Sequence, residues 1–453
     1  MPIYWSKLSF ISLFLLSTVV LFGQNVPKEN SPYSRYGLGN INPTEFAPLQ
    51  SMGGIAAGYN NPYQLNLTNP ASTAFLNYTS FETGGFAKYS VLSANDESAS
   101  NWSGNISHFA LGFPLRNPVN KALNREKSPY DYGMALGLMP YSLTGYDVES
   151  TSTLPNIGDV TYKYLGSGAT YQAFLNSSIK YNDLAVGGHI GYLFGSGIDE
   201  TATLFSDVEN AFSNVLRDEY SLNGFIWRLG VQYEFIIGKT PEDDAKTLVE
   251  RPRLVIGAYG NSGSNIDITG NSIAARTNSL YTGSNLDTIV SSVEIEDVMN
   301  LPSEFGVGFT YSLLTDKKRR IKFGSDFKIG QWAQYNNPLK NETLANSWRV
   351  AVGAEMVPNT NSYNRYTDLM RYRVGFHYGT DPRVINAEQL TDYGLTLGFG
   401  FPLKLPRGMP SFMNIGLEAG KLTAPNSLSE NYYKINLGFT LNDNTWFYKQ
   451  KFN

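Results

Sequence analysis

Histidine is the side chain in this sequence whose ordinary pKa best suits acid–base chemistry at neutral pH, and the chain has no cysteine for a thiolate metal site. The 453 residues contain three histidines, His108, His189 and His377. They are widely separated, and the residue alternation around them predicts that each points from a strand into the same interior. Isolated polar residues are therefore the better interpretation than a shared metal site. We expect no bound metal and no cofactor.

Other signatures of catalysis are also missing from the sequence. It has no G-x-S-x-G nucleophile turn, no phosphate-binding glycine loop and no H-E-x-x-H zinc motif. Many serines are present, but none is marked by a neighbouring base. The formal net charge is -4, which gives no electrostatic reason to expect binding to nucleic acid. We therefore predict a protein that is not an enzyme and does not bind nucleic acid.

The dominant pattern after about residue 77 is a period of two. In "MRYRVGFHYG", Val374 and Phe376 alternate with Arg373 and His377, and similar segments recur to the C-terminus. Successive side chains of a strand point to opposite faces, so each segment has one apolar face and one polar or glycine face. On the apolar face we place Trp227, Leu229, Val374, Phe376 and Leu437. On the other face we place His108, His189, Arg228, Arg371, Arg373, His377, Glu418 and Lys434.

This alternation suits either a secreted soluble sandwich or a membrane barrel, and three features favour the barrel. The segments are about ten residues long, which is enough to cross a bilayer at a tilt. Aromatic residues gather at the ends of the segments, as in interfacial girdles, and glycines recur on the non-apolar face. No interior segment approaches 18 unbroken apolar residues. We predict an all-β, antiparallel transmembrane β-barrel.

The number of such segments is about 14, and an even number suits a single-chain bacterial barrel. We predict strands near 78–90, 102–115, 131–142, 170–181, 184–195, 223–237, 253–264, 304–313, 320–333, 346–357, 369–379, 392–402, 411–422 and 431–442. The connections 143–169, 196–222 and 265–303 are then long outward loops. Their apolar residues could form a ligand pocket: Phe205, Phe212, Val215, Leu216, Ile266, Ile268 and Leu280.

Two N-terminal segments lack the alternation. Lys7 followed by the apolar run 8–22 reads as a secretory signal, so we assign 1–24 to a signal peptide with cleavage near Gly23 or Gln24. Residues 25–76 are rich in Gly, Pro, Asn and Ser, too polar for lipid and too long for a simple leader. We expect 25–76 to form a plug inside the barrel formed by 77–453.

Residues 51–72, "SMGGIAAGYNNPYQLNLTNPAS", resemble the hatch of the FadL-like outer-membrane transporters. Met52, Gly53 and Gly54 match a small-residue run of that family. Asn69, Pro70 and Ala71 match its Asn-Pro-Ala step before the first strand, and "LPSEFGVGFTY" at 301–311 is similar to a Leu-Pro start of a mid-barrel strand. The resemblance implies a plugged barrel in the outer membrane of a Gram-negative cell.

The opening of the predicted mature chain differs from the fatty-acid transporters proper. "NSPYSRYGLGNINP", residues 30–43, looks like a branch whose barrels also serve as accessory subunits of secretion and barrel-assembly machines. Two functions are therefore open. The first is passive uptake of hydrophobic small molecules or detergent-like ligands. The second is a non-conducting accessory subunit bound to other outer-membrane proteins, with membrane lipid around the wall in both cases.

Pro140 interrupts the third predicted strand. A proline cannot donate a ladder hydrogen bond, so it belongs at a bulge or at the end of a strand. The strand could simply end at Met139. Alternatively Pro140 marks a local break in the wall, and FadL-like proteins are thought to use a kink in this same strand as a sideways exit for ligand.

Overall fold

The computed structural model describes residues 28–94, 97–116, 129–205, 207–208, 211–237, 251–277, 287–315, 318–340, 342–404, 409–425 and 427–443. The predicted signal peptide, 1–24, lies outside these residues. Over the described ranges, no helix is long and apolar enough to cross a membrane.

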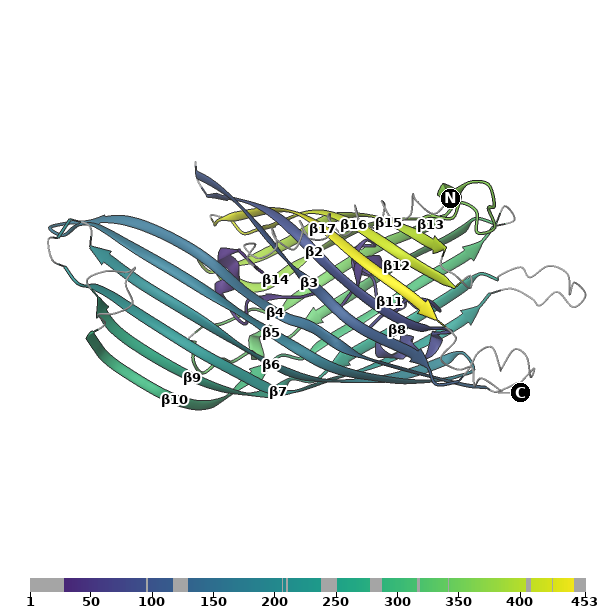
Figure 1. The fold of residues 1–453 in the computed structure, drawn as a ribbon, viewed down its shortest axis with the longest axis horizontal. Coiled ribbons are helices and arrows are strands. Elements are labelled where there is room, and N and C mark those ends of the chain that lie inside the picture. Colours follow the sequence, from purple (N-terminus) through teal and green to yellow (C-terminus); the bar gives the residue numbers. More distant parts are fainter. Residues whose placement is uncertain are drawn as a thin grey trace, which may run out of the picture.

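Most of the described chain forms one closed antiparallel sheet (Figure 1). Its first strands are β2 (Thr79–Ala94), β3 (Glu97–Pro114), β4 (Tyr130–Leu154), β5 (Gly158–Tyr181), β6 (Leu184–Phe205), β7 (Ser213–Ile236), β8 (Arg253–Asn261) and β9 (Ser264–Thr277). The later strands are β10 (Asp287–Leu301), β11 (Glu304–Leu314), β12 (Arg320–Gly330), β13 (Ser347–Val357), β14 (Arg371–Ile385), β15 (Glu388–Lys404), β16 (Pro410–Thr423) and β17 (Ser429–Asp443).

Pairing of β17 with β2 closes the sheet into a barrel. Strands β8 and β9 are two halves of one crossing, since both pair with β7, and β10 and β11 continue one another beside them. The barrel therefore has 14 crossings, and the predicted fold class is confirmed. A soluble two-sheet sandwich is excluded by this closure.

The alternation in the sequence corresponds to the two faces of the wall. On β14, Val374 and Phe376 are 49% and 40% exposed, whereas Arg373 and His377, which flank this pair in the sequence, are buried. The apolar residues face outward, where a bilayer would surround them, and the polar residues face the lumen. Trp227, Leu229 and Leu437 are likewise exposed on the outer face.

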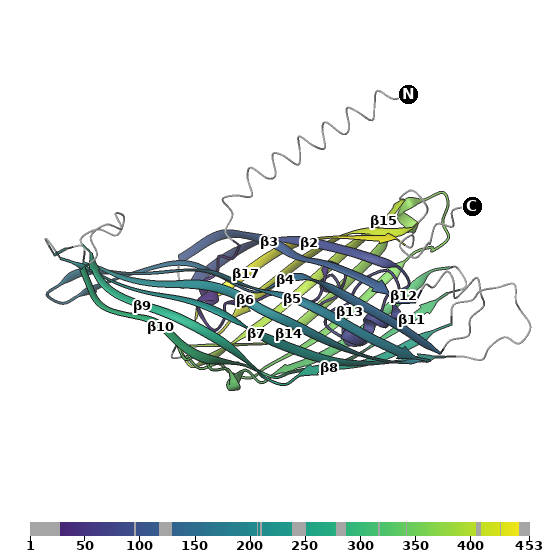
Figure 2. The same ribbon diagram turned by 60° about the horizontal axis from the view of Figure 1, so that its bottom comes forward.

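The predicted long outward loops are wrong. Strands β4 and β5 continue as a ladder to a turn near residue 156, β6 and β7 pair from Leu184↔Tyr233 to Thr203↔Asn214, and β9 and β10 fill most of 265–303. These extensions make one side of the barrel taller than the other (Figures 1 and 2). The alternation of apolar and polar residues ends where lipid would end, because neither face of such an extension needs a row of apolar side chains. The backbone hydrogen bonds between the strands continue beyond that point.

The described N-terminal residues 28–76, which we call the luminal segment, lie inside the barrel (Figure 2). They contain η1 (Pro32–Arg35), β1 (Asn40–Ile41), α2 (Ala47–Gln50) and η2 (Pro70–Phe75). Tyr33, Leu49, Met52, Tyr59 and Leu67 are among their fully buried side chains. The core of this protein is thus formed between the luminal segment and the inner face of the wall.

Candidate functional site in the lumen

The Asn-Pro-Ala step of the luminal segment is fixed to the wall by Asn69. Its side-chain oxygen accepts a hydrogen bond from the Ala71 amide at 3.1 Å, which caps η2. Its side-chain nitrogen donates to the carbonyls of Val231 on β7 and Ala258 on β8 at 3.1 and 3.3 Å. Pro70 begins η2, where a missing N–H leaves no donor unsatisfied. One asparagine therefore joins a local turn to two wall strands.

The small residues around Met52 allow the segment to touch the opposite wall. Gly53 has φ +72°, a backbone conformation that residues with a Cβ rarely adopt, and Gly54 also has a positive φ. A Cβ on Gly375 of β14 would come within 2.1 Å of the Gly53 nitrogen. The Gly53 amide donates to Thr396 Oγ1 on β15 at 3.0 Å. The backbone of the segment thus rests directly on the backbone of the wall.

Inward-facing polar side chains of the wall satisfy the irregular backbone between these two points. Asp326 Oδ2 on β12 accepts the amides of Ala56 and Ala57, each at 2.6 Å. Gln232 on β7 donates to the Ala57 carbonyl at 2.9 Å, and Glu82 on β2 accepts the Leu65 amide at 2.6 Å. Buried backbone groups need such partners. The sequence shows Asp326, Gln232 and Glu82 as inward polar residues but does not reveal what they bind.

A buried ion pair lies beneath the segment. Arg373 Nε on β14 contacts Glu355 Oε2 on β13 at 2.8 Å, with both side chains nearly inaccessible, and Arg373 Nη1 donates to Asn414 at 2.9 Å. Arg371 donates to Gln64 of the luminal segment at 3.3 Å. Both arginines face inward, where the sequence places them. They fill the interior around the segment.

The upper lumen contains a cavity of about 410 Å³ whose walls are highly charged. Lys328 and Arg228 approach Glu304 at 3.0 and 4.0 Å, and Tyr432 donates to Asp392 at 2.9 Å. Other charged residues of the lining include Glu29, Lys88, Arg349, Glu418, Glu430 and Lys434. Apolar residues such as Leu143, Leu301 and Trp332 line the same cavity, so charged and apolar side chains share its walls.

The structure does not bring the three histidines together. His108 stacks on Phe46 with ring centroids 3.4 Å apart, and His189 lies 5.4 Å from the ring of Phe174. His377 approaches Asp392 at 3.4 Å and Glu418 at 4.0 Å. In the described part of the chain, no group of three or more His, Asp or Glu side chains could hold a metal ion.

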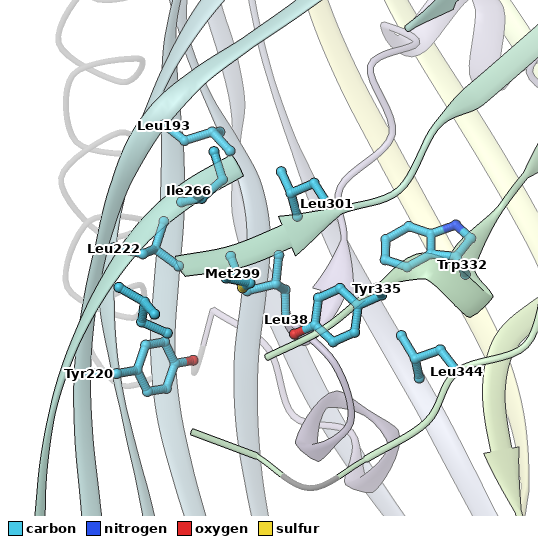
Figure 3. Close-up of a cluster of buried hydrophobic side chains, with 11 residues drawn as sticks. Leu38, Leu193, Tyr220, Leu222, Ile266, Met299, Leu301, Trp332, Tyr335 and Leu344 are labelled. Atoms are coloured by element: carbon cyan, nitrogen blue, oxygen red, sulfur yellow. The ribbon is translucent and has the colours of Figure 1, made fainter. Parts of the chain in front are cut away.

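An apolar cluster on the inner face of the tall side borders this cavity (Figure 3). Its wall residues are Leu193, Tyr220, Leu222, Ile266, Ile268, Met299 and Leu301. Leu38 of the luminal segment and Trp332, Tyr335 and Leu344 of the β12–β13 connection pack against them. The connection is held down by Glu342, which accepts the Gly37 amide at 2.9 Å, and by Lys340, 2.6 Å from Asp199.

This cluster corrects the predicted ligand pocket. Ile266 and Ile268 are completely covered by the protein's own side chains, while Phe212 and Leu216 are 57% and 45% exposed on the tall side. Phe205 and Val215 are partly exposed, and Leu280 lies outside the described residues. Since the apolar residues split between a filled core and an open surface, they do not line a common pocket.

Pro140 lies at a bulge, and β4 does not end at Met139. The register of β4 against β5 shifts between Pro140 and Ser142. On the other edge, β3 pairs with β4 only from Phe109↔Leu138 to Pro114↔Gly133. Beyond that point the luminal segment takes over: β1 pairs with Ser142 and Leu143, and Asn42 donates its backbone amide to the Tyr141 carbonyl at 2.8 Å.

These features can be compared with known proteins. A family model described as BamG matches residues 6–453. The chain belongs to the BamG family. No curated protein matches this member of the BamG family.

Solved structures share its fold at low sequence identity. The toluene transporter TbuX of Ralstonia pickettii has a TM-score of 0.53 at 13% identity over 89% of this chain and 98% of TbuX. The Pseudomonas putida toluene transporter TodX has a TM-score of 0.52 at 14% identity, covering 89% and 99%. The CymD monoaromatic hydrocarbon channel has a TM-score of 0.51 at 14% identity, covering 89% and 98%. This BamG-family chain therefore has the barrel fold of the FadL-like channels.

Proposed function

We propose that this BamG-family protein is a non-conducting barrel of the Gram-negative outer membrane and an accessory subunit of a barrel-assembly machine. The observation that carries the proposal is that the luminal segment is hydrogen-bonded to strands on several sides of the wall. Asn69 joins the luminal segment to β7 and β8, Asp326 to β12, and Gly53 to β15. Because these hydrogen bonds reach strands on different sides of the barrel, they favour a luminal segment that stays fixed in place over one that moves aside to open a channel. Membership of the BamG family supports a role among outer-membrane protein partners.

The chemistry of the lumen supports the same function. A hydrophobic solute passing through the lumen would displace water from the charged side chains around Glu304 and Asp392, and desolvating charged groups is unfavourable. Leu38, Trp332 and Leu344 of the apolar cluster line the same cavity, so charged and apolar side chains share its walls. A subunit that conducts nothing needs only a stable wall and exposed surfaces for its partners.

Extraction from native outer membranes tests this function. A tagged copy, solubilised in a mild detergent, is expected to elute with the barrel-assembly machine in a fixed ratio. Depletion of the protein is expected to slow the membrane insertion of other barrels. Elution as a lone monomer under conditions that keep the machine itself intact, together with normal barrel insertion after depletion, would refute the proposal.

Passive uptake of hydrophobic small molecules is the second candidate, and the break in the wall at Pro140 favours it. The solved barrels of the same fold include toluene transporters, and a wall opening beside β4 is where an apolar molecule could leave sideways. Accumulation of toluene and long-chain lipids in cells with and without the protein separates the two candidates. Equal accumulation would exclude uptake.

We also propose that the luminal segment is the hatch that keeps the barrel closed. Removing residues 31–68 would leave a 14-crossing barrel with a polar, water-filled interior. In planar bilayers the deletion variant is expected to show large steady conductance, against almost none for the intact chain. A deletion variant that folds, as judged by its heat-modifiable mobility, but does not conduct would rule out this role.

A further inference from the structure

The upper half of β3 has an unpaired edge in the wall. From Glu97 to Gly112, β3 pairs with β2. On its other side it pairs with β4 only from Phe109 to Pro114. Among the described residues, none continues the ladder along that edge between Glu97 and His108. The two strands lie side by side at one end of the barrel and diverge toward the tall end (Figure 1).

Part of this edge lies at the depth of the bilayer. The ring of Trp102 is 4.9 Å from that of Tyr89, which is 6.5 Å from that of Tyr433, and all three belong to an outward-facing aromatic belt. Below the belt, Ile106 is 52% exposed on the outer face. Residues 103–108 are therefore on the membrane side of the belt, where water cannot satisfy an exposed backbone edge.

The chain satisfies this edge only in part. The Ile106 amide donates to its neighbour's side chain, Asn105 Oδ1, at 2.9 Å, in place of a ladder bond. Three alternate side chains retain a buried polar atom with no partner in the described structure: Asn101 Oδ1, Ser103 Oγ and Asn105 Nδ2. Because their spacing is two, they lie on one face of the strand. Because they alternate with the outward-facing Trp102 and Ile106, this short row of unpaired groups faces the lumen, on the inner side of the unpaired edge.

Strand β4 cannot move across to complete the ladder, since the luminal segment already occupies its facing edge. In addition to β1 and Asn42, the Ser31 amide donates to the Gly145 carbonyl at 2.9 Å, and Ser34 Oγ accepts the Gly145 amide at 3.0 Å. Ser31 is in turn tied to Glu430 of β17 at 2.6 Å. The separation of β3 from β4 is thus built into the contacts of the N-terminal segment.

We propose that the unpaired edge of β3, Glu97 to Ser107, binds an extended strand of a partner outer-membrane protein. Only a polypeptide backbone supplies donors and acceptors at the strand spacing that such an edge requires. The partner strand would place small or polar residues beside Asn101, Ser103 and Asn105, and apolar residues beside Trp102 and Ile106. An apolar small molecule could fill the space but could not satisfy these groups. The proposal rests on the proposed function only for the identity of the partner.

Site-directed crosslinking tests this, and the absence of cysteine makes each single-cysteine variant specific. Ser98→Cys, Ser100→Cys, Trp102→Cys and Ile106→Cys, each carrying a thiol-linked benzophenone, are irradiated in native outer membranes. Successive positions on β3 are expected to crosslink to successive residues of one partner segment in a monotonic order, which is the mark of a paired strand. Leu417→Cys on β16, outward-facing and paired on both sides, is the control and is expected to label lipid.

Three outcomes would overturn the proposal. These are adducts with lipid alone at all four positions, adducts with β4 of the same chain, and adducts scattered over a partner without order. The proposed function fails separately. Ordered adducts with a protein outside the barrel-assembly machine would support the strand-binding site and refute the proposed function. Co-elution with the machine without ordered adducts would support the proposed function and refute the strand-binding site.

Discussion

The two sides of the barrel differ in height and in what their surfaces contact. On the short side, β12 to β17 are 11 to 17 residues long, and apolar and polar side chains alternate along nearly their whole length. On the tall side, β4 to β7 are 22 to 25 residues long, and alternation stops part of the way up. Ladder hydrogen bonds thus set the length of a strand, while the solvent around it sets the pattern of its side chains.

Ion pairs provide the largest expected contrast between the two sides. Arg373–Glu355 on the short side is fully buried, whereas Arg217–Glu219 on the tall side is 44% and 42% exposed. Arg373→Ala leaves a carboxylate buried without its partner and is expected to cost about 3–5 kcal/mol of unfolding free energy. Arg217→Ala is expected to cost less than about 1 kcal/mol. Urea titration in lipid vesicles measures both, and equal costs would contradict the buried pair.

Exposed valines give the next contrast. Val374 on β14 and Val293 on β10 are both exposed, at 49% and 66%, but only Val374 is expected to face lipid. Val374→Lys should therefore lower the unfolding free energy by about 2–4 kcal/mol. Val293→Lys should change it by no more than about 0.5 kcal/mol. Urea titration in lipid vesicles measures both changes in unfolding free energy. A large penalty at Val293 would mean that the tall side is also immersed in the membrane.

The apolar cluster allows a smaller test within the tall side. Ile268 is 1% exposed beneath the β12–β13 connection, and Leu216 is 45% exposed on the same wall. Ile268→Val should cost about 0.5–1.5 kcal/mol through a lost methyl group, with faster amide exchange in residues 331–340. Leu216→Val, the control, should leave that exchange unchanged. If neither variant alters the exchange, the connection is not held by this cluster.

Pro140→Val is expected to have the smallest effect. The sequence suggests that valine would restore a ladder and close the wall. In the structure, however, the edge of β4 next to Pro140 is already occupied by β1 and Asn42. The change in unfolding free energy should therefore stay within about 0.5 kcal/mol. A disulfide-trapping experiment that detected new β3–β4 contact above Leu138 would show that valine does close the gap.

Much of the fold could be predicted because a barrel wall is a local pattern. Each of the 14 predicted segments overlaps a wall strand, since lipid on one face and protein on the other impose a period of two on every crossing. The same reasoning failed for 143–169, 196–222 and 265–303. Their strands have water or protein on both faces, which removes the only signal that the prediction used.

The candidate site was predictable in composition but not in its contacts. An inward row of polar residues can be read from alternation, and Asn69 can be recognised as a turn residue. That Asn69 bonds Val231 and Ala258, or that Asp326 holds Ala56 and Ala57, depends on segments more than 150 residues apart in the chain. Nothing local in the sequence encodes such a pairing, because a buried backbone group can be satisfied by any suitably placed side chain.

The sequence by itself determined the β-barrel wall, its two faces and the irregular segment before it. Each of these follows from whether the side chains of a short stretch alternate between apolar and polar. Only the tertiary structure decided how the wall ends and where it opens. The tall side depends on ladders between strands, and the filled cluster depends on a connection that folds inward. The unpaired edge of β3 depends on the luminal segment, which occupies the facing edge of β4. All three result from competition between distant parts of the chain for the same hydrogen bonds and the same buried space.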